Sequence, residues 1–333
     1  MENKTIMHIG KSLLIFLLLF IGLDRGLGYL LEKIYYAQAR GDYFQTTYAV
    51  QKANEKVLIF GSSRALHHYV SDVFEKKLNL TTYNIGRNGK NILYSYALLS
   101  QILTHHKPEI IILDVQQKEL SWKSGKDGED EMISSLLPYA QHAPVIANSI
   151  SAIRKEDIIL STLFKTYPYN SNVAQILGYH YGFMSELKNV KGYAPLNGNK
   201  VKMEENNNSE KAKEEVIDKK LMEAFDNFLS LAKKNRSKVY IIVSPTSTNS
   251  YETSVKSIPK MKIIAQKYGF NLYDFSRSKE FEDYKLFYDY THLNNEGAVK
   301  FSNLVLDKVI EHPAVLVNHL SPTLINIDKN NTQ

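Results

Sequence analysis

Cysteine is absent from this chain of 333 residues. Its absence excludes disulfide bonds, a cysteine nucleophile and thiolate metal sites. Long basic runs are missing too: 41 lysines and arginines against 35 acidic residues give a net charge of +6, but five basic residues never stand together. A charge dispersed in this way does not follow a nucleic-acid backbone, so we expect no nucleic-acid partner.

Charged residues are also lacking in one N-terminal stretch. The run from Leu13 to Leu23 is apolar throughout, and the pattern continues past Asp24 and Arg25 to Leu31. A surface helix of a soluble protein needs a polar face, which this run does not have. The uninterrupted run alone suits a signal-peptide core of about 7 to 15 residues, whereas the longer stretch suits a membrane anchor of about 20. Asp24 and Arg25 can neutralise each other near an interface.

We favour an uncleaved anchor that begins near Ile6 or Ser12 and ends at Leu31. A signal peptide needs a cleavage site close behind its apolar core. The small-x-small sequence Ala-Gln-Ala at residues 37–39 lies well beyond Leu23, with charged and bulky residues between. The sequence therefore predicts a chain that remains attached to the membrane.

Basic residues before the apolar run indicate the orientation of this anchor. Lys4 and Lys11 place the N-terminus inside by the positive-inside rule. The rest of a single-pass protein would then face the periplasm or the exterior of the cell membrane. We expect an anchor at 1–33, a membrane-proximal linker at 34–55, an α/β domain at 56–311 containing an insertion or lid within 119–235, and a tail at 312–333.

The stretch from Val57 to Arg64, VLIFGSSR, combines a strand with a polar turn. Its first four residues are apolar, which is typical of a strand buried on both faces of a parallel sheet. Ligands bind beyond the carboxyl ends of such strands. Gly61 permits a tight turn there, and Ser63 would present its hydroxyl beside backbone N–H groups. An ordinary turn or a helix cap fits the same residues, so the serine alone does not define a site.

A second polar segment follows more than two hundred residues later, at Tyr288 to Gly297. Asp289 and His292 are three residues apart, so one helix-like turn brings their side chains to the same face. The carboxylate could then hold one ring nitrogen and leave the other free to remove a proton from a serine. Asp289 could equally cap the last helix, with His292 packed at its start.

Three segments resemble sequence blocks of the SGNH (GDSL-like) hydrolase superfamily. Gly61-Ser62-Ser63 is similar to the first block, with Ser63 at the position of the nucleophile. Residues 83–91, YNIGRNGKN, are similar to the second block, and Gly89 falls on its oxyanion-hole glycine. Residues 289–294, DYTHLN, are similar to the fifth block, which supplies the acid and the base of the triad. The resemblance implies a Ser63–His292–Asp289 triad.

The third block departs from the family pattern. After a predicted strand at 109–115 the family has an asparagine whose amide completes the oxyanion hole. By spacing, Lys118 occupies this position, with Gln117 beside it, and either side chain could donate a hydrogen bond. The departure leaves open a second interpretation: a catalytically degenerate protein of the same fold that binds glycan or a membrane partner.

The predicted fold is a three-layer, flavodoxin-like α/β fold with about five parallel strands, an N-terminal transmembrane helix and a helical insertion. Strands and helices alternate along the domain, which implies right-handed crossovers and a parallel sheet. The predicted strands are 57–60, 81–85, 109–115, 238–243 and 271–275, and the predicted helices are 71–78, 91–104, 216–233, 255–268 and 295–311. The insertion contains aromatic residues that either line a sugar-binding groove or pack inside: Trp122, Tyr139, Tyr167, Tyr169, Tyr179, Tyr181 and Tyr193.

The resemblance also implies an activity, that of a serine esterase or O-acyltransferase acting on acyl groups, such as acetyl, of cell-envelope polysaccharide. Arg64, Asn88 and Ser244 are candidate substrate contacts. The expected partners are the membrane, an acylated glycan and a membrane acyl-donor protein; a lipase or thioesterase remains an alternative. No cofactor or metal is expected, because the adjacent histidine pairs at 67–68 and 105–106 lack an accompanying carboxylate cluster.

Overall fold

The computed structural model describes residues 2–39, 41–121, 133–183, 189–201, 215–247 and 255–310. Its centre is a sheet of five parallel strands in the order β2-β1-β3-β4-β5. The strands are β1 (Val57–Phe60), β2 (Thr82–Asn84), β3 (Ile110–Asp114), β4 (Lys238–Val243) and β5 (Asn271–Asp274). The α/β class and the parallel sheet of five strands are therefore confirmed, and each strand lies at its predicted place.

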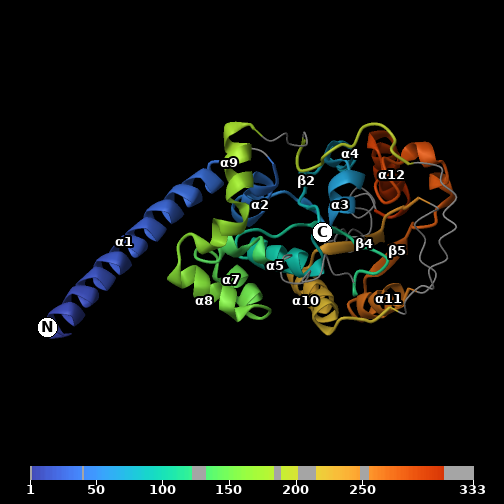
Figure 1. Ribbon diagram of the computed structural model, residues 1–333. Helices are drawn as coiled ribbons and strands as arrows, with labels where there is room; N and C mark the ends of the chain where they lie inside the picture. The colour runs from blue at the N-terminus through green and yellow to red at the C-terminus, as the bar shows by residue number, and fades with distance from the viewer. Residues whose placement is uncertain are drawn as a thin grey trace, which may run out of the picture.

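Alternate residues of each strand face opposite layers of helices. Leu58 and Phe60 of β1 belong to one apolar core, while Val57 and Ile59 belong to a second. The first layer contains α5 (Ile92–Ile102), α10 (Lys219–Asn235) and α11 (Ser257–Lys267), and the second contains α3 (Ser63–His68), α4 (Ser71–Leu78) and α12 (Asn295–Lys308). Helices cover both faces of the sheet (Figure 1), which is why the strands are apolar without alternation.

Capping side chains set the starts of several helices. The side chain of Asn91 accepts the N–H of Leu93 (3.1 Å) at the start of α5, and that of Asp218 accepts the N–H of Lys220 (2.7 Å) at the start of α10. Each carboxamide or carboxylate satisfies an N–H group that has no acceptor within the helix. The predicted start of α10 at residue 216 was therefore too early, because the helix begins only behind its cap.

Residues 41–51, part of the stretch for which we expect a membrane-proximal helix and linker, form α2 (Gly41–Gln51) and pack against the domain. The side chains that α2 buries include Gln45, Thr46 and Thr47, so its inner face is largely polar. Gln45 Nε2 donates to the carbonyl oxygens of Asn84 (3.0 Å) and Gly192 (3.1 Å), which joins the helix to the end of β2. An apolar helical period cannot reveal such a helix.

The predicted insertion is mainly helical in its described parts, while residues 189–201 form turns and an isolated bridge between Val190 and Tyr193. It contains η1 (Leu137–Tyr139), α7 (Pro144–Ser151), α8 (Lys155–Leu163), η2 (Tyr167–Asn172) and α9 (Val173–Tyr181). The N-terminal helix α1 (Glu2–Tyr36) projects from this side of the domain (Figure 1). Its segment Lys4–Tyr36 is long and apolar enough to cross a membrane. The predicted tail at 312–333 and Trp122 lie outside the described residues.

Gly192 lies where the chain around Lys191 runs along the edge of β2. The N–H of Asn84 donates to the carbonyl oxygen of Lys191 (2.9 Å). Gly192 has φ of +83°, and a Cβ at this position would lie 1.7 Å from the carbonyl oxygen of Asn84. Both the backbone conformation and the close approach therefore require glycine.

We expect Gly192→Ala to lower the free energy of unfolding by at least about 2 kcal/mol more than Gly198→Ala, as urea unfolding would measure. Gly198 is a matched control because its φ is also positive, at +87°, while no atom lies within 4 Å of a Cβ built there. Equal losses for the two variants would contradict the steric argument.

Candidate active site

The turn after β1 places Ser63 at the carboxyl edge of the sheet. Gly61 has φ of +142°, and a Cβ there would lie 2.6 Å from the carbonyl oxygen of Asp114. The next residue, Ser62, caps α3 by accepting the N–H of Arg64 (3.4 Å). Ser63 is therefore the first residue of α3, and its side chain leaves the sheet edge at a fixed position.

Ser63, His292 and Asp289, which lie far apart in the sequence, meet in one hydrogen-bond chain. His292 Nε2 lies 2.8 Å from Ser63 Oγ, and His292 Nδ1 lies 2.9 Å from each carboxylate oxygen of Asp289. The backbone N–H groups of Thr291 and His292 also donate to Asp289 Oδ1, each at 2.9 Å. The segment thus holds its carboxylate and its imidazole in one orientation.

The charge of Asp289 sets the tautomer of His292. Partial burial acts to raise the pKa of Asp289, but the hydrogen bonds from His292 and from the backbone N–H groups outweigh it and hold that pKa below its ordinary value. An ionised carboxylate only accepts hydrogen bonds, so Nδ1 of a neutral His292 carries the proton. Nε2 is then an acceptor for the Ser63 hydroxyl, which is the arrangement of a general base beside a nucleophile.

The three side chains are reachable from solvent. Side-chain exposure is 21% for His292 and 37% for Asp289. The neighbouring Asn88 and Gly89 are exposed, and a Cβ built at Gly89 would meet no atom within 4 Å. The backbone N–H of Gly89, a predicted oxyanion donor, therefore belongs to an open surface loop.

His68, a buried residue of α3, holds the backbone that carries His292. Its Nε2 accepts the N–H of Leu293 (3.0 Å), so its proton lies on Nδ1, which donates to Ser244 Oγ (2.9 Å). Burial, together with the neighbouring His292 charge, holds the pKa of His68 well below its ordinary value. A neutral His68 thus fixes the backbone immediately after His292. Ser244 is fully buried in this contact, so the predicted role as a substrate contact is wrong.

Arg64 is also buried rather than directed at substrate. It is 5% exposed; Nη2 donates to the carbonyl oxygen of Val115 (2.6 Å) and Nε lies 3.7 Å from Asp114 Oδ1. Asp114 Oδ2 in turn accepts the hydroxyl of Tyr69 (2.7 Å). The guanidinium therefore compensates a buried carboxylate at the end of β3, which corrects the prediction that Arg64 contacts substrate.

His67 connects the loop that carries Gly89 to α3. Its Nε2 lies 3.2 Å from Asn88 Oδ1, and its Nδ1 donates to the carbonyl oxygen of Ala194 (2.6 Å). The ring of His67 packs edge to face on that of His292, with centroids 5.5 Å apart. Asn88 therefore lies near the triad, and its role as a substrate contact stays a prediction.

Glu119 is a structural link that the sequence did not reveal. Its Oε1 accepts the N–H of Ile92 (2.8 Å) at the start of α5, and its Oε2 accepts the N–H of Gln116 (3.0 Å). It joins the segment of the second block to the segment of the third. Complete burial raises the pKa of Glu119 to about 7. No local pattern marks this residue, since both of its partners are backbone groups.

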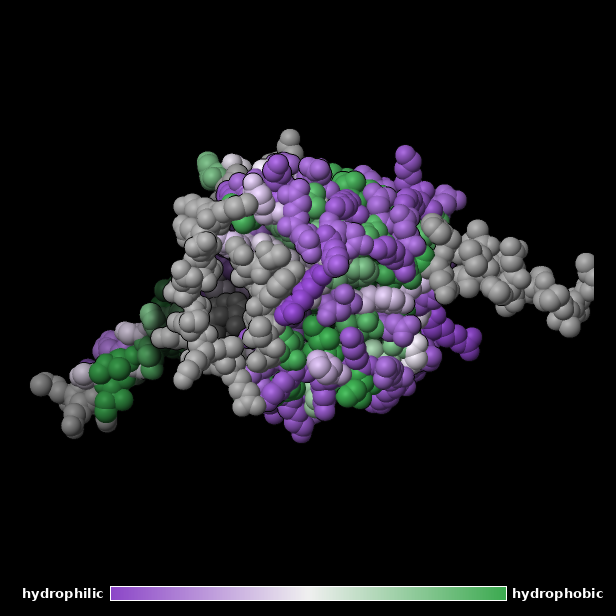
Figure 2. Space-filling view, turned by 90° about the vertical axis from the view of Figure 1, so that its right-hand side faces the viewer, coloured by the Kyte–Doolittle hydropathy of each residue, from purple (hydrophilic) through white to green (hydrophobic). Residues whose placement is uncertain are grey.

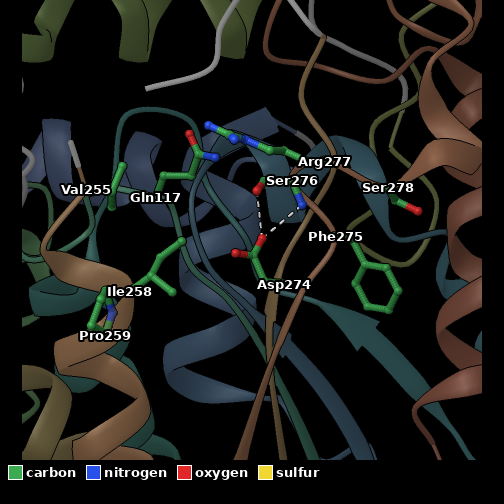
Figure 3. Close-up of a pocket in the computed structure, with 9 residues that line it drawn as sticks. All are labelled: Gln117, Val255, Ile258, Pro259, Asp274, Phe275, Ser276, Arg277 and Ser278. Carbon is green, nitrogen blue, oxygen red and sulfur yellow. Dashed lines mark hydrogen bonds between the residues drawn. The ribbon is translucent and has the colours of Figure 1, made fainter. Parts of the chain in front are cut away.

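Gln117, predicted as an oxyanion donor, lines a cavity between α11 and the end of β5 (Figure 3). The cavity has a volume of about 460 Å³, and Asp274, Ser276 and Arg277 contribute to its polar rim. Asp274 Oδ1 accepts the N–H (3.0 Å) and the hydroxyl (2.7 Å) of Ser276. None of the described residues that line this cavity belongs to the triad. Lys118 follows in the same turn, where its carbonyl accepts the N–H of Ser121 (3.0 Å).

Three of the six described tyrosines of the insertion pack inside the protein, whereas Tyr181 is 61% exposed. Tyr139, Tyr169 and Tyr193 are 1%, 2% and 4% exposed. The Tyr139 hydroxyl lies 3.1 Å from that of Tyr35 and 2.7 Å from that of Thr47. These three rings therefore stabilise the attachment of α1 and the core instead of lining a sugar-binding groove. Within the described ranges, no group of three or more acidic or histidine side chains is placed to hold a metal ion.

The fold and the site define an α/β protein with a serine, a histidine and an aspartate in contact at the carboxyl edge of a parallel sheet. The chain belongs to the family described as "Protein of unknown function (DUF1574)", whose model matches residues 27–309. Among curated proteins no match is found. The three-layer α/β architecture that the sequence predicts, with about five parallel strands between two layers of helices, is confirmed.

Several solved structures are similar to this chain at low identity. An acetyl xylan esterase, AlAXEase, is 13% identical with a TM-score of 0.36, covering 76% of this chain and 100% of that chain. A Streptococcus pneumonia protein assigned provisionally as a platelet activating factor is 11% identical with a TM-score of 0.35, covering 91% and 99%. A Bacteroides fragilis protein assigned provisionally as an acylhydrolase is 13% identical with a TM-score of 0.35, covering 79% and 93%.

The buried His68 predicts a loss of stability in acid. Because burial lowers its pKa in the folded state below that of the unfolded chain, the unfolded chain binds the extra proton once the pH falls below about 6.5. We expect the free energy of unfolding to fall by up to about 1.4 kcal/mol per pH unit from this residue alone. His68→Gln should remove this contribution from the slope measured by urea unfolding between about pH 6.5 and 5. Equal slopes in the two proteins would contradict the prediction.

Proposed function

We propose that this protein is a serine esterase or O-acyltransferase that forms an acyl-enzyme on Ser63. The observation that supports the proposal is the continuous contact from Ser63 Oγ through His292 to Asp289, at 2.8 and 2.9 Å. In this proposal Ser63 is the nucleophile, His292 is the general base and acid, and Asp289 orients and stabilises the imidazolium.

The proposed reaction proceeds in two halves. Ser63 Oγ attacks the ester carbonyl carbon while His292 Nε2 takes its proton, and the same nitrogen then protonates the leaving alcohol as the ester bond breaks. Water or a sugar hydroxyl next attacks the acyl-enzyme, giving its proton to His292, and the bond to Ser63 breaks with return of that proton to Oγ. Hydrolysis and transfer differ only in which oxygen enters at this second attack.

The oxyanion would be held by backbone N–H groups. Ser63 is the first residue of α3, so its N–H has no acceptor within the helix, and Gly89 provides the second predicted donor on an open loop. Of the two side chains proposed as a third donor, Lys118 is favoured, because Gln117 lines the cavity beside β5. Loss of one donor costs about 3 to 4 kcal/mol of transition-state stabilisation, so this position decides how fast the chemistry can be.

We further propose that the substrate is an acylated envelope glycan. The partial exposure of His292 and Asp289 suits a bulky polymer whose small acyl group alone enters the site. The apolar Lys4–Tyr36 helix supports attachment to the cell membrane, and Lys4 and Lys11 favour a domain facing the periplasm or the exterior. A membrane protein that delivers acyl groups would be a fitting donor for transfer.

Labelling by a fluorophosphonate probe tests the proposed nucleophile. We expect wild-type protein to be labelled, Ser63→Ala to be unlabelled, and His292→Ala to react at least about a thousandfold more slowly, because the hydroxyl has lost its base. Ser278→Ala is a matched serine control at the same edge of the sheet and should label as wild type does.

Unlabelled but folded wild-type protein, or labelled Ser63→Ala, would overturn the assignment. The first of these outcomes would favour the second candidate, a degenerate protein of this fold that binds glycan or a membrane partner. The departure at Lys118 is the observation behind that candidate.

Acyl-chain preference separates an acetyl esterase from a lipase or thioesterase. The cavity of about 460 Å³ lies beside β5, and its described lining includes no triad residue, so it does not hold an acyl chain at Ser63. We expect kcat/KM for a nitrophenyl acetate to exceed that for the decanoate by at least about tenfold. A preference for the longer chain would contradict this substrate class.

A further inference from the structure

Three apolar side chains stand exposed at the end of α8, and we refer to them as the α8 patch. They are Ile159, Leu163 and Phe164, with exposures of 50%, 57% and 36%. The opposite side of the same helix buries Asp157 and Ser161 against the insertion. Asp157 and Ser161, the residues of α8 that are fully buried, are thus polar, while Ile159 and Leu163 on the opposite side of the helix are exposed.

One end of the α8 patch contacts the apolar run of α1. The ring of Phe164 packs edge to face on the ring of Phe20, with centroids 6.2 Å apart, and Arg25 Nη2 donates to the carbonyl oxygen of Leu163 (3.1 Å). Phe20 precedes Asp24 by four residues, which corresponds to about 6 Å along a helix. Measured along the axis of α1, the patch therefore extends beyond Asp24 and lies beside the uncharged run.

Polar contacts fix α1 to this part of the domain. Asp24 is 8% exposed and accepts the N–H of Lys165 (2.8 Å) and both the N–H (3.1 Å) and the hydroxyl (2.6 Å) of Thr166. Lys165 Nζ donates to Glu32 Oε1 (3.0 Å), further along α1 toward the domain. A Cβ at Gly28 would lie 2.4 Å from Lys165 Cγ, so the two segments approach as closely as glycine allows. The relation between α1 and the patch is therefore rigid.

We infer that the α8 patch inserts into the lipid hydrocarbon beside α1, at the boundary where the helix leaves the membrane. The inference rests on the proposal that α1 spans the membrane. Lipid is the occupant that the geometry favours, because the patch is continuous with the exposed apolar surface of α1, including Phe20 and Leu23, which are 44% and 62% exposed. An element at the level of Phe20 cannot stay in water if Phe20 is in hydrocarbon.

Insertion of the patch would fix how the domain rests on the membrane. An interfacial helix buries its apolar face about 5 to 10 Å deep, which agrees with the depth of about 6 Å given by Phe20. The face of the domain turned away from α1 is mainly hydrophilic (Figure 2), as expected for the side that looks into the aqueous space. The domain would then be attached to the bilayer through both α1 and the α8 patch, which limits its rotation relative to the membrane.

Fluorescence quenching in lipid nanodiscs tests this inference with the full chain. Because the sequence has no cysteine, single cysteines can be introduced at Ile159 or Leu163 and labelled with an environment-sensitive fluorophore. The nanodiscs contain phosphatidylethanolamine and phosphatidylglycerol, with or without doxyl-labelled lipid. Leu18→Cys on the exposed surface of α1 reports lipid, and Lys219→Cys on α10, with a side chain 84% exposed, reports water.

We expect doxyl lipid to quench labels at residues 159 and 163 at least about half as strongly as at residue 18, and iodide to quench them at least about threefold less than at residue 219. Iodide quenching equal to that at residue 219, with lipid quenching retained at residue 18, would overturn the inference while α1 remains a membrane span. Protection from both quenchers would indicate a protein partner and would also overturn it. Water exposure at residue 18 would overturn the anchor itself, and the inference with it.

Discussion

The hydrogen bond between His292 Nε2 and Ser63 Oγ joins two segments 229 residues apart, and the organisation of the site depends on it. Each partner is held from its own side. Ser63 is fixed by the turn at Gly61, where only glycine fits between β1 and the end of β3. His292 is fixed by Asp289 and, through the next peptide N–H, by His68 of the helix that begins with Ser63. The nucleophile and the base are thus positioned by the same short helix.

A polar layer beneath the site explains why two residues expected to touch substrate are buried. Ser244 contacts His68, and Arg64 lies beside Asp114, a carboxylate that is 2% exposed. A buried charge is tolerated only where hydrogen bonds and an opposite charge compensate it. The layer connects the ends of β1, β3 and β4, so it holds together the strand ends from which the site is built. Burial raises the pKa of Asp114, which marks how fully this layer is removed from water.

The sequence predicts the elements that follow a simple rule. The apolar strands and the serine, histidine and aspartate of the site each carry a local signal. Residues whose partners are distant backbone groups do not: His68 accepts from Leu293, and Glu119 accepts from Ile92 and Gln116. The bounds of α2 and its packing on the domain were not predicted, because this helix buries Gln45 and its neighbours, which satisfy carbonyl groups instead of following an apolar period. Local patterns report burial of apolar surface, whereas these contacts depend on the completed fold.

In the proposed reaction Ser63 carries the acyl group between donor and acceptor. The most direct measurement is mass spectrometry of wild-type protein, mixed with an activated acetyl ester and quenched in acid before turnover is complete. We expect one added acetyl group on the peptide that contains Ser63, and we expect this adduct to decay when the protein is returned to neutral pH. Folded protein without the adduct, or a stable adduct on another residue only, would contradict the proposed role of Ser63.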